Sequence, residues 1–585
     1  MNRSPLKISS GVRIIAFAVP FMIVGACSSQ PQSPSLGVAG PSTFGLAMGT
    51  EREIGSPFGD FLAGSYALDT GRLEEAGAFF ERALAADPDD PDLLRQVYLL
   101  ALAGGRYDQA VELAARVVAL DPNDEDARLL LALDAARAGQ FDAARKSLGA
   151  IDDRGVAGLA APFLDAWAMF GQGGDDVAAH SLARLNEGES LGALNVYHEA
   201  MLLALDDRPG EAEAMLRDGM PEDGPAPVRL IQAQASMLAQ QGEVDAAIRL
   251  VREQVAERPD QPLLENMLVD LQAGRTPQPP FTDATGGMAD ALYGIAQALH
   301  QEQGGARAVL YARMALFLKP DLAEATLLIG EALAEQENYE AAIASYQTID
   351  PASPLSYVGK LRTADALHQL ERKEQAYELL ENLAGAAPER VEALIELGNL
   401  LRSDEQYARA EQAYSRAIER LGAPEREHWR LYYARGIAYE RTKQWPKAEA
   451  DFLQALELEP EQPFVLNYLG YSWVDMGLNL GEARGMLKRA VEARPNDGYI
   501  VDSVGWVHYR LGEYADAVDS LERAVELEPG DPVINDHLGD AYWRVGRQRE
   551  ARYQWQRALT LEPDEELVEG IEKKLKSGLP APDRA

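Results

Sequence analysis

Cysteine is nearly absent from this sequence: among 585 residues there is one, Cys27. A lone cysteine excludes an intramolecular disulfide, and it excludes zinc and iron–sulfur sites that need several thiolates. The fold must therefore be held together by non-covalent packing, for which the hydrophobic content of 46% is ample.

Basic residues are scarce relative to acidic ones. Lys and Arg total 55 against 93 Asp and Glu, which gives a formal charge of −38. A groove that follows a phosphate backbone needs clustered cations, so nucleic acid is not expected as a partner. The acidity favours basic partners, but it equally serves the solubility of a long chain with much surface.

Motifs that carry catalysis are missing as well. The sequence has no phosphate-binding loop, no HExxH helix and no nucleophile elbow. The histidines follow no metal-ligand spacing; they are His180, His198, His300, His368, His428, His508 and His537. We therefore expect no enzymatic activity, no metal, no cofactor and no small-molecule substrate.

Long apolar runs are limited to one, Ile14 to Val24, which is too short for a membrane-spanning helix of about 20 residues. Three cations precede it (Arg3, Lys7 and Arg13), and the small residues Gly25 and Ala26 follow it. This order of charged, apolar and small residues is typical of an export signal.

The end of that signal, Val24-Gly25-Ala26-Cys27, resembles the lipobox of bacterial lipoproteins. The resemblance implies a signal peptide over 1–26 and a Cys27 that is lipidated on its sulfur and anchors the chain to a membrane. The alternative is an ordinary secretory signal with an incidental thiol. In a Gram-negative host, Ser28 after the cysteine implies the outer membrane, with the protein facing the periplasm of the cell envelope.

Residues 27–56 are rich in Ser, Pro, Gly and Gln, a composition that cannot bury enough apolar surface to fold. They are predicted to form a flexible tether between the lipid and the rest of the chain.

From residue 57 onward, small and aromatic residues return with a period of 34. The last two units show it: Gly505 and Gly539, Ala517 and Ala551, Ala524 and Ala558, Pro529 and Pro563 are each 34 apart. The pattern resembles the tetratricopeptide repeat, a hairpin of two helices, A and B. One unit fills every slot of that pattern, with Gly436, Tyr439, Ala448, Phe452, Ala455 and Pro460. The resemblance implies an all-α superhelix of roughly 14 hairpins, in two arrays.

Helix packing explains the pattern. Small residues let helix A approach helix B closely, proline ends helix B, and apolar side chains at i, i+3, i+4 and i+7 form the buried stripe. No single hairpin can bury its own apolar face, so stability comes from stacking on neighbours.

Breaks in the periodicity predict the domain boundaries. An N-terminal array covers 57–273 and is degenerate after residue 158. A linker at 274–287 carries three prolines within four residues, Pro277, Pro279 and Pro280, which exclude a continuous helix. A C-terminal array covers 288–571, and residues 572–585 form a tail.

The resemblance also implies a binding surface, because helix A lines the concave groove of tetratricopeptide arrays. Projected onto four C-terminal repeats, the groove positions are Tyr433, Arg441, Asn467, Tyr471, Tyr499, Asp502, Trp506, Tyr509, Arg510, Asp536, Asp540, Trp543 and Arg544. Trp, Tyr and Arg are enriched in binding hot spots. The alternative for part of this set is packing between helices, the role expected of Trp473 and Trp555.

Together these features predict a membrane-anchored scaffold or adaptor that binds a protein or peptide in its groove. One alternative is a component of outer-membrane protein assembly or polysaccharide export machinery. Another is a non-catalytic subunit that partners a separate envelope enzyme.

Overall fold

The computed structural model describes residues 56–152, 154–173, 182, 192–220, 226–258 and 261–580. The predicted signal peptide, Cys27 and the tether lie outside these residues. Within them the regular structure consists of α-helices and one short 3-10 helix, Arg426–His428, with no strand. No described helix is long and apolar enough to cross a membrane.

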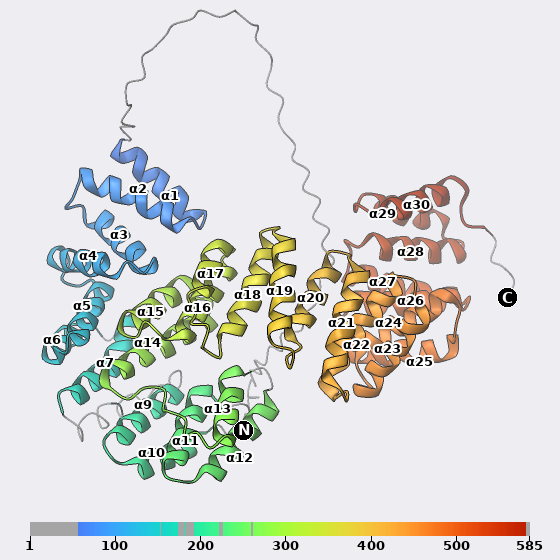
Figure 1. Ribbon diagram of the computed structural model, residues 1–585. Coiled ribbons are helices and arrows are strands. Elements are labelled where there is room, and N and C mark those ends of the chain that lie inside the picture. The colour runs from blue at the N-terminus through green and yellow to red at the C-terminus, as the bar shows by residue number, and fades with distance from the viewer. Residues whose placement is uncertain are drawn as a thin grey trace, which may run out of the picture. The chain divides into compact units, whose positions relative to one another are not determined.

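Consecutive helices pair into A–B hairpins, as the period of 34 predicts (Figure 1). The helices before the proline-rich segment are α1 (Pro57–Asp69), α2 (Leu73–Ala86), α3 (Pro91–Ala103), α4 (Tyr107–Leu120), α5 (Glu125–Arg137), α6 (Phe141–Leu148), α7 (Gly155–Gly171), α9 (Gly192–Leu205), α10 (Pro209–Asp218), α11 (Val228–Gln240), α12 (Val244–Glu257) and α13 (Pro262–Gln272).

The second series begins with helix A of a new hairpin and ends with a single helix. Its members are α14 (Ala284–Gln301), α15 (Gly305–Leu318), α16 (Ala323–Glu335), α17 (Tyr339–Tyr346), α18 (Ser356–Gln369), α19 (Lys373–Ala386), α20 (Glu392–Ser403), α21 (Tyr407–Leu421), α22 (Trp429–Arg441), α23 (Trp445–Leu458), α24 (Pro463–Met476), α25 (Leu480–Ala493), α26 (Gly498–Arg510), α27 (Tyr514–Leu527), α28 (Pro532–Arg544), α29 (Gln548–Leu559) and α30 (Glu565–Ser577). Two boundaries differ from the predicted ones. Helix α14 begins inside 274–287 because Asp283 caps it, and α30 continues past residue 571.

Close contact between a helix-A glycine and a helix-B aromatic ring holds several of the hairpins together. A Cβ atom on Gly436 would lie 2.6 Å from Phe452, and one on Gly539 would lie 2.5 Å from Trp555. Real Cβ atoms do not approach so closely, so a larger residue would push the two helices apart. Trp555 and Trp473 are buried, which confirms their predicted packing role.

The proline-rich segment contributes to the core. Phe281 is buried, and its ring packs edge-on against Trp167 of α7 with centroids 5.0 Å apart. The backbone carbonyl of Gln278 accepts from Ser236 at 3.2 Å, and that of Pro280 accepts from Lys319 at 3.1 Å. One hydrophobic core therefore continues from Ala67 to Tyr346, across the predicted boundary between the arrays.

The A helices of the first repeats are covered by the chain itself. Helix α15 packs against α3 and α5, and α14 packs against α7. The Arg313 guanidinium of α15 donates to the carbonyl of Ala103 at 2.8 Å, and Phe317 packs against Tyr107 at 5.4 Å between centroids. Since helix A lines the concave side of such arrays, part of this side is used for internal packing in the N-terminal repeats.

Candidate functional site

The candidate site is the helix-A face of α22, α24, α26 and α28, which we call the C-terminal groove. Its centre is an aromatic stack that joins α26 to α28. Trp506 stacks on Tyr509, one turn later, with centroids 4.7 Å apart and planes 7° apart. Trp506 also stacks on His537 of α28, with ring centroids 4.0 Å apart and planes 15° apart.

Polar contacts fix this stack in place. The His537 imidazole lies 3.0 Å from the carboxylate of Asp502, and the Tyr509 hydroxyl accepts from Arg544 at 3.1 Å. The indole N–H of Trp506 is buried and has no hydrogen-bond partner in the described part of the chain. An unbonded buried donor costs about 1 to 3 kcal/mol, so this N–H makes the arrangement of the stack less favourable.

Carboxylates form the second part of the groove. Lys574 of α30 lies 2.6 Å from Asp536 and 2.8 Å from Asp540. Asp540 also accepts from the buried Trp555 indole at 2.9 Å. Asp540 is thus held between a helix-B core residue and the final helix.

Burial and charge shift the protonation of these groups. Burial, with the nearby Asp536, raises the pKa of Asp540 to about 6, although Lys574 acts against the shift. For His537, burial acts to lower the pKa, but the carboxylates of Asp502, Asp536 and Asp540 outweigh it and the pKa is raised. The groove therefore has a carboxyl group with a pKa of about 6 and a histidine whose raised pKa favours the charged form.

The predicted groove residues do not all lie at this centre. Tyr433 is half-buried against Phe452 and Tyr468, with centroid distances of 6.1 and 5.9 Å, so it contributes to packing. Arg510 is exposed and donates to the backbone carbonyl of Asp475 in α24 at 2.9 Å. It therefore points away from the Trp506 stack and toward the preceding repeat.

The other members lie along the face or at its end. Asn467 and Tyr471 are half-buried on α24, Tyr499 is 53% exposed at the start of α26, and Arg441 is exposed at the end of α22. At the last repeat, Arg544 donates to the carbonyl of Pro580 at 2.6 Å, and the backbone at Gly578 passes close to Trp543. The chain's own C-terminal segment therefore covers this end of the groove.

Two groove residues were missed from the sequence, His537 and Lys574. His537 lies two residues before the repeat glycine, a position that the projection of helix A did not include. Lys574 follows Asp540 by one period of 34, beyond the predicted end of the array. Continuing the period into α30 would have found it.

One group of possible metal ligands lies near the groove. His508, Glu513 and Asp516 bring ligand atoms within 4.8 Å of one another. However, Glu513 bonds to His508 at 2.6 Å and pairs with Arg484 at 2.9 Å. These contacts account for its position, so the group does not indicate a metal site.

Comparison with known families agrees with this architecture. Models described as Tetratricopeptide repeat match residues 60–91, 306–357 and 361–425, residues 101–157, and residues 429–462 and 502–531. The chain belongs to the tetratricopeptide-repeat family. As a tetratricopeptide-repeat protein it has the fold of a protein–protein interaction scaffold.

Its similarity to individual relatives is partial. TPR repeat-containing protein PA4667 of Pseudomonas aeruginosa is 27% identical over 190 residues, which are 32% of this chain and 31% of that protein. Superkiller complex protein 3 of Mus musculus is 26% identical over 182 residues, 30% of this chain and 11% of that protein. The tetratricopeptide chain thus spans less than a third of the length of these relatives.

Among solved structures, the chain is similar to the Cut9–Hcn1 tetramer of the APC/C, with a TM-score of 0.36 and 16% identity over 84% of this chain and 96% of that one. For yeast Tom70 the TM-score is 0.29, with 13% identity over 89% of this chain and 95% of that one.

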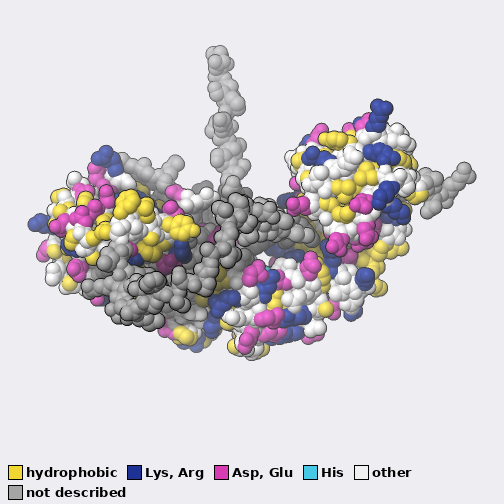
Figure 2. All heavy atoms as spheres, turned by 90° about the horizontal axis from the view of Figure 1, so that it is seen from above, with side chains coloured by type: hydrophobic (Ala, Val, Ile, Leu, Met, Phe, Trp, Pro, Cys, Tyr) yellow, Lys and Arg dark blue, Asp and Glu magenta, His cyan; other side chains and the backbone are white. Residues whose placement is uncertain are grey.

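Charges of both signs are mixed on one described face of the molecule. On the face shown in Figure 2, Lys and Arg side chains are interspersed with Asp and Glu. A continuous basic track, which would follow a phosphate backbone, is not seen on the described part of this face.

Proposed function

We propose that this protein is a non-catalytic scaffold of the bacterial cell envelope, anchored by a lipid on Cys27. It binds a protein or peptide partner in the C-terminal groove. The observation that carries the proposal is the Trp506 stack. A Trp, a Tyr, a His and an Arg meet on one face, and the buried indole N–H of the Trp has no hydrogen-bond partner among the described residues.

We place the partner in the C-terminal groove because other parts of the chain cover several of the helix-A faces elsewhere. In the N-terminal repeats, α14 and α15 pack against α3, α5 and α7. At the last repeat, residues 578 to 580 cover Trp543 and Arg544. The surface between these ends, from Tyr471 to Trp506, is the part of the C-terminal groove best suited to a partner.

Chemistry defines the kind of partner. Aromatic faces accept flat or apolar side chains, and arginine or lysine bind over such rings. Asp502 and Asp536 add negative charge beside the rings. A partner segment that carries a basic residue next to an apolar one matches both features.

Photo-crosslinking in intact cells tests the proposal. A benzoylphenylalanine at Tyr499 on the groove rim should capture a partner that mass spectrometry identifies. The matched control is the same replacement at Tyr553 of α29, which is 63% exposed but lies on a B helix. Capture from both positions, or from Tyr553 alone, would contradict binding in the groove.

A further inference from the structure

At several junctions, neighbouring B helices are linked by an arginine that lies six residues after the helix-B alanine. Arg489 donates to the carbonyl of Pro460 at 2.7 Å, and Arg557 donates to that of Pro529 at 2.9 Å. Arg116 bonds in the same way to Pro88, and Arg416 pairs with Glu381 at 2.8 Å. We call these bonds B-helix clasps, because each links one B helix to the preceding one.

The junction of α2 and α4 shows a second bond of this kind. Arg106, four residues before the helix-B alanine, pairs with Glu81 of the preceding B helix at 3.2 Å. With both bonds formed, the space left between α2, α3 and α4 is about 310 Å³.

The junction of α17 and α19 has lost both bonds. Asn382 stands where the clasp arginine belongs, and Gln347 stands where Glu81 belongs. Helix α17 has 8 residues, whereas α2, α4 and α19 have 14 each. The hydrophobic core also divides at α17. Tyr346 is the last residue of one buried cluster, whereas Ile343 of the same helix belongs to the next cluster.

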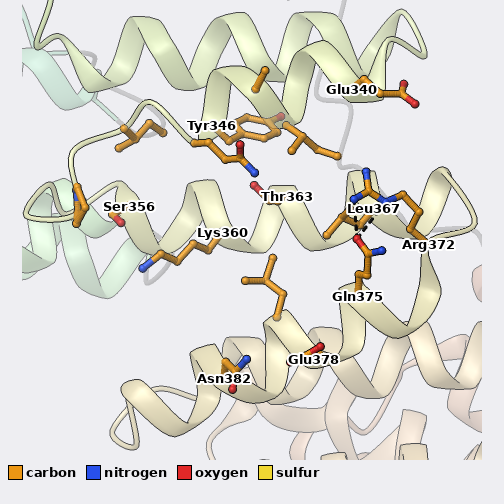
Figure 3. Close-up of a pocket in the computed structure, with 16 residues that line it drawn as sticks. Glu340, Tyr346, Ser356, Lys360, Thr363, Leu367, Arg372, Gln375, Glu378 and Asn382 are labelled. Carbon is orange, nitrogen blue, oxygen red and sulfur yellow. Dashed lines mark hydrogen bonds between the residues drawn. The ribbon is translucent and has the colours of Figure 1, made fainter.

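A cleft of about 710 Å³ lies at this junction. Figure 3 shows α17 and α19 as its two walls and α18 as its floor. Helix α18 contributes residues at helical spacing: Ser356, Lys360, Thr363 and Leu367. This row rises about 17 Å along the helix, the length of about five residues of extended chain.

The lining combines apolar and hydrogen-bonding groups. Ile343, Leu367 and Leu379 offer contact to apolar side chains, while the amides of Gln347, Gln375 and Asn382 can donate to and accept from a peptide backbone. Arg372, the counterpart of Arg106, donates to Gln375 at 2.6 Å and has no ion-pair partner in the described part of the chain. Gln347 replaces the carboxylate at the position of Glu81, and the two carboxylates of the lining, Glu340 and Glu378, lie at other positions.

We infer that this cleft is a second binding site, for an extended peptide that carries a carboxylate side chain. The peptide backbone bonds to the amides, and its carboxylate pairs with Arg372 as Glu81 pairs with Arg106. The site lies between B helices, so it is separate from the C-terminal groove and does not depend on the function proposed for it.

Restoring the lost bonds provides the test. In the closing variant, Gln347→Glu and Asn382→Arg are combined. They return both residues to the types found at α2 and α4, so thermal stability should be unchanged or higher. The probe is a phage-displayed library of random heptapeptides, panned on the full chain. Fluorescence polarisation then measures the enriched peptides on each variant.

The expected peptides carry Asp or Glu and bind the closing variant at least 10-fold more weakly. Replacing the peptide's carboxylate by an amide should weaken binding to a similar extent, as should Arg372→Gln in the protein. Trp506→Ala should leave the affinity unchanged. Failure to enrich any peptide, equal binding to the closing variant, or dependence on Trp506 would each overturn the proposal.

Discussion

The indole ring of Trp506 and the imidazole ring of His537 lie face to face, with centroids 4.0 Å apart, although they belong to successive repeats. His537 is in turn held by Asp502, one turn before Trp506 in the same helix. Tyr509 and His537 both stack on Trp506, so the Trp506 side chain loses little conformational entropy when a partner binds. This favours Trp506 as an anchor for the partner.

Replacing Trp506 should therefore affect binding more than stability. An aromatic anchor at the centre of an interface contributes about 2 kcal/mol or more, so Trp506→Ala should weaken partner capture roughly 30-fold. Because Trp506 is half-buried, its stability cost should stay below the roughly 3 to 5 kcal/mol expected for a core tryptophan.

Trp555→Ala is the matched comparison, since Trp555 is fully buried beneath Gly539. Urea unfolding and partner capture should be measured on both variants, with Arg510→Ala as a surface control. A Trp506→Ala protein that loses as much stability as Trp555→Ala but still captures the partner would assign Trp506 to packing.

Stability should fall as pH rises through the range in which the groove titrates. The pKa of Asp540 is about 6 in the folded protein against 3.8 for an ordinary Asp, so between these values the unfolded chain has released a proton that the folded chain retains. Ionisation of Asp540 thus costs the folded state on the order of 2 to 3 kcal/mol. His537, whose pKa is raised, adds stability that is complete below pH 6.5 and lost as the pH rises through its folded value.

Asp540→Asn tests the acidic part of this range. Urea unfolding at pH 4, 5, 6 and 7 should show that the variant gains stability relative to the wild type between pH 4 and 6. His537→Gln should be less stable than the wild type at pH 4 to 6, and this loss should shrink as the pH rises above 6.5. An Asp540→Asn difference that does not vary with pH would show that this carboxylate does not titrate as described.

Cleavage by trypsin after Arg275 should be slow in the folded protein. The side chain of Arg275 is exposed, but Phe281 and the bonded carbonyls of Gln278 and Pro280 fix the backbone that follows it. Phe281→Ala should speed this cleavage, whereas Val269→Ala, at a site 57% exposed, should not. Rapid cleavage of the wild-type chain after Arg275 would show that residues 274–287 form a flexible linker, as the prolines alone suggested.

Membrane attachment should depend on one atom, the sulfur of Cys27. Several acyl chains on one cysteine bind a bilayer effectively permanently. Cys27→Ser should therefore move the protein from the membrane fraction to the soluble fraction. A variant that stays bound after a high-salt wash would exclude the lipid as the anchor.

Local packing was predictable from the sequence, and distant packing was not. Gly436 and Phe452 lie 16 residues apart, so a period of 34 with alternating small and aromatic positions identified both the hairpins and their contacts. The bond from Arg313 to Ala103 joins residues 210 positions apart and leaves no periodic signal.

For the candidate site, the positions of the residues were predictable, but the contacts of their side chains were not. The helix-A projection found Asp502, Trp506 and Tyr509, because these lie at fixed offsets from the repeat glycine. It could not tell that Arg510 would turn to Asp475, or that residues 578 to 580 would cover Trp543 and Arg544. Those outcomes depend on which neighbour each side chain meets, and a repeat pattern does not contain that information.

The packing of α15 against α3 and α5 affects the order in which this chain can fold. A simple repeat array can fold from any unit, because each unit contacts only its neighbours. Here the first repeats complete their packing only when α15 is present, because Arg313 of α15 bonds to Ala103, which lies 210 residues earlier in the chain. Contacts of such long range slow folding and join distant units into one cooperative transition. Deleting a repeat near residue 100 should therefore destabilise helices near residue 313, and during synthesis the apolar surface of α3 and α5 stays uncovered until α15 emerges from the ribosome.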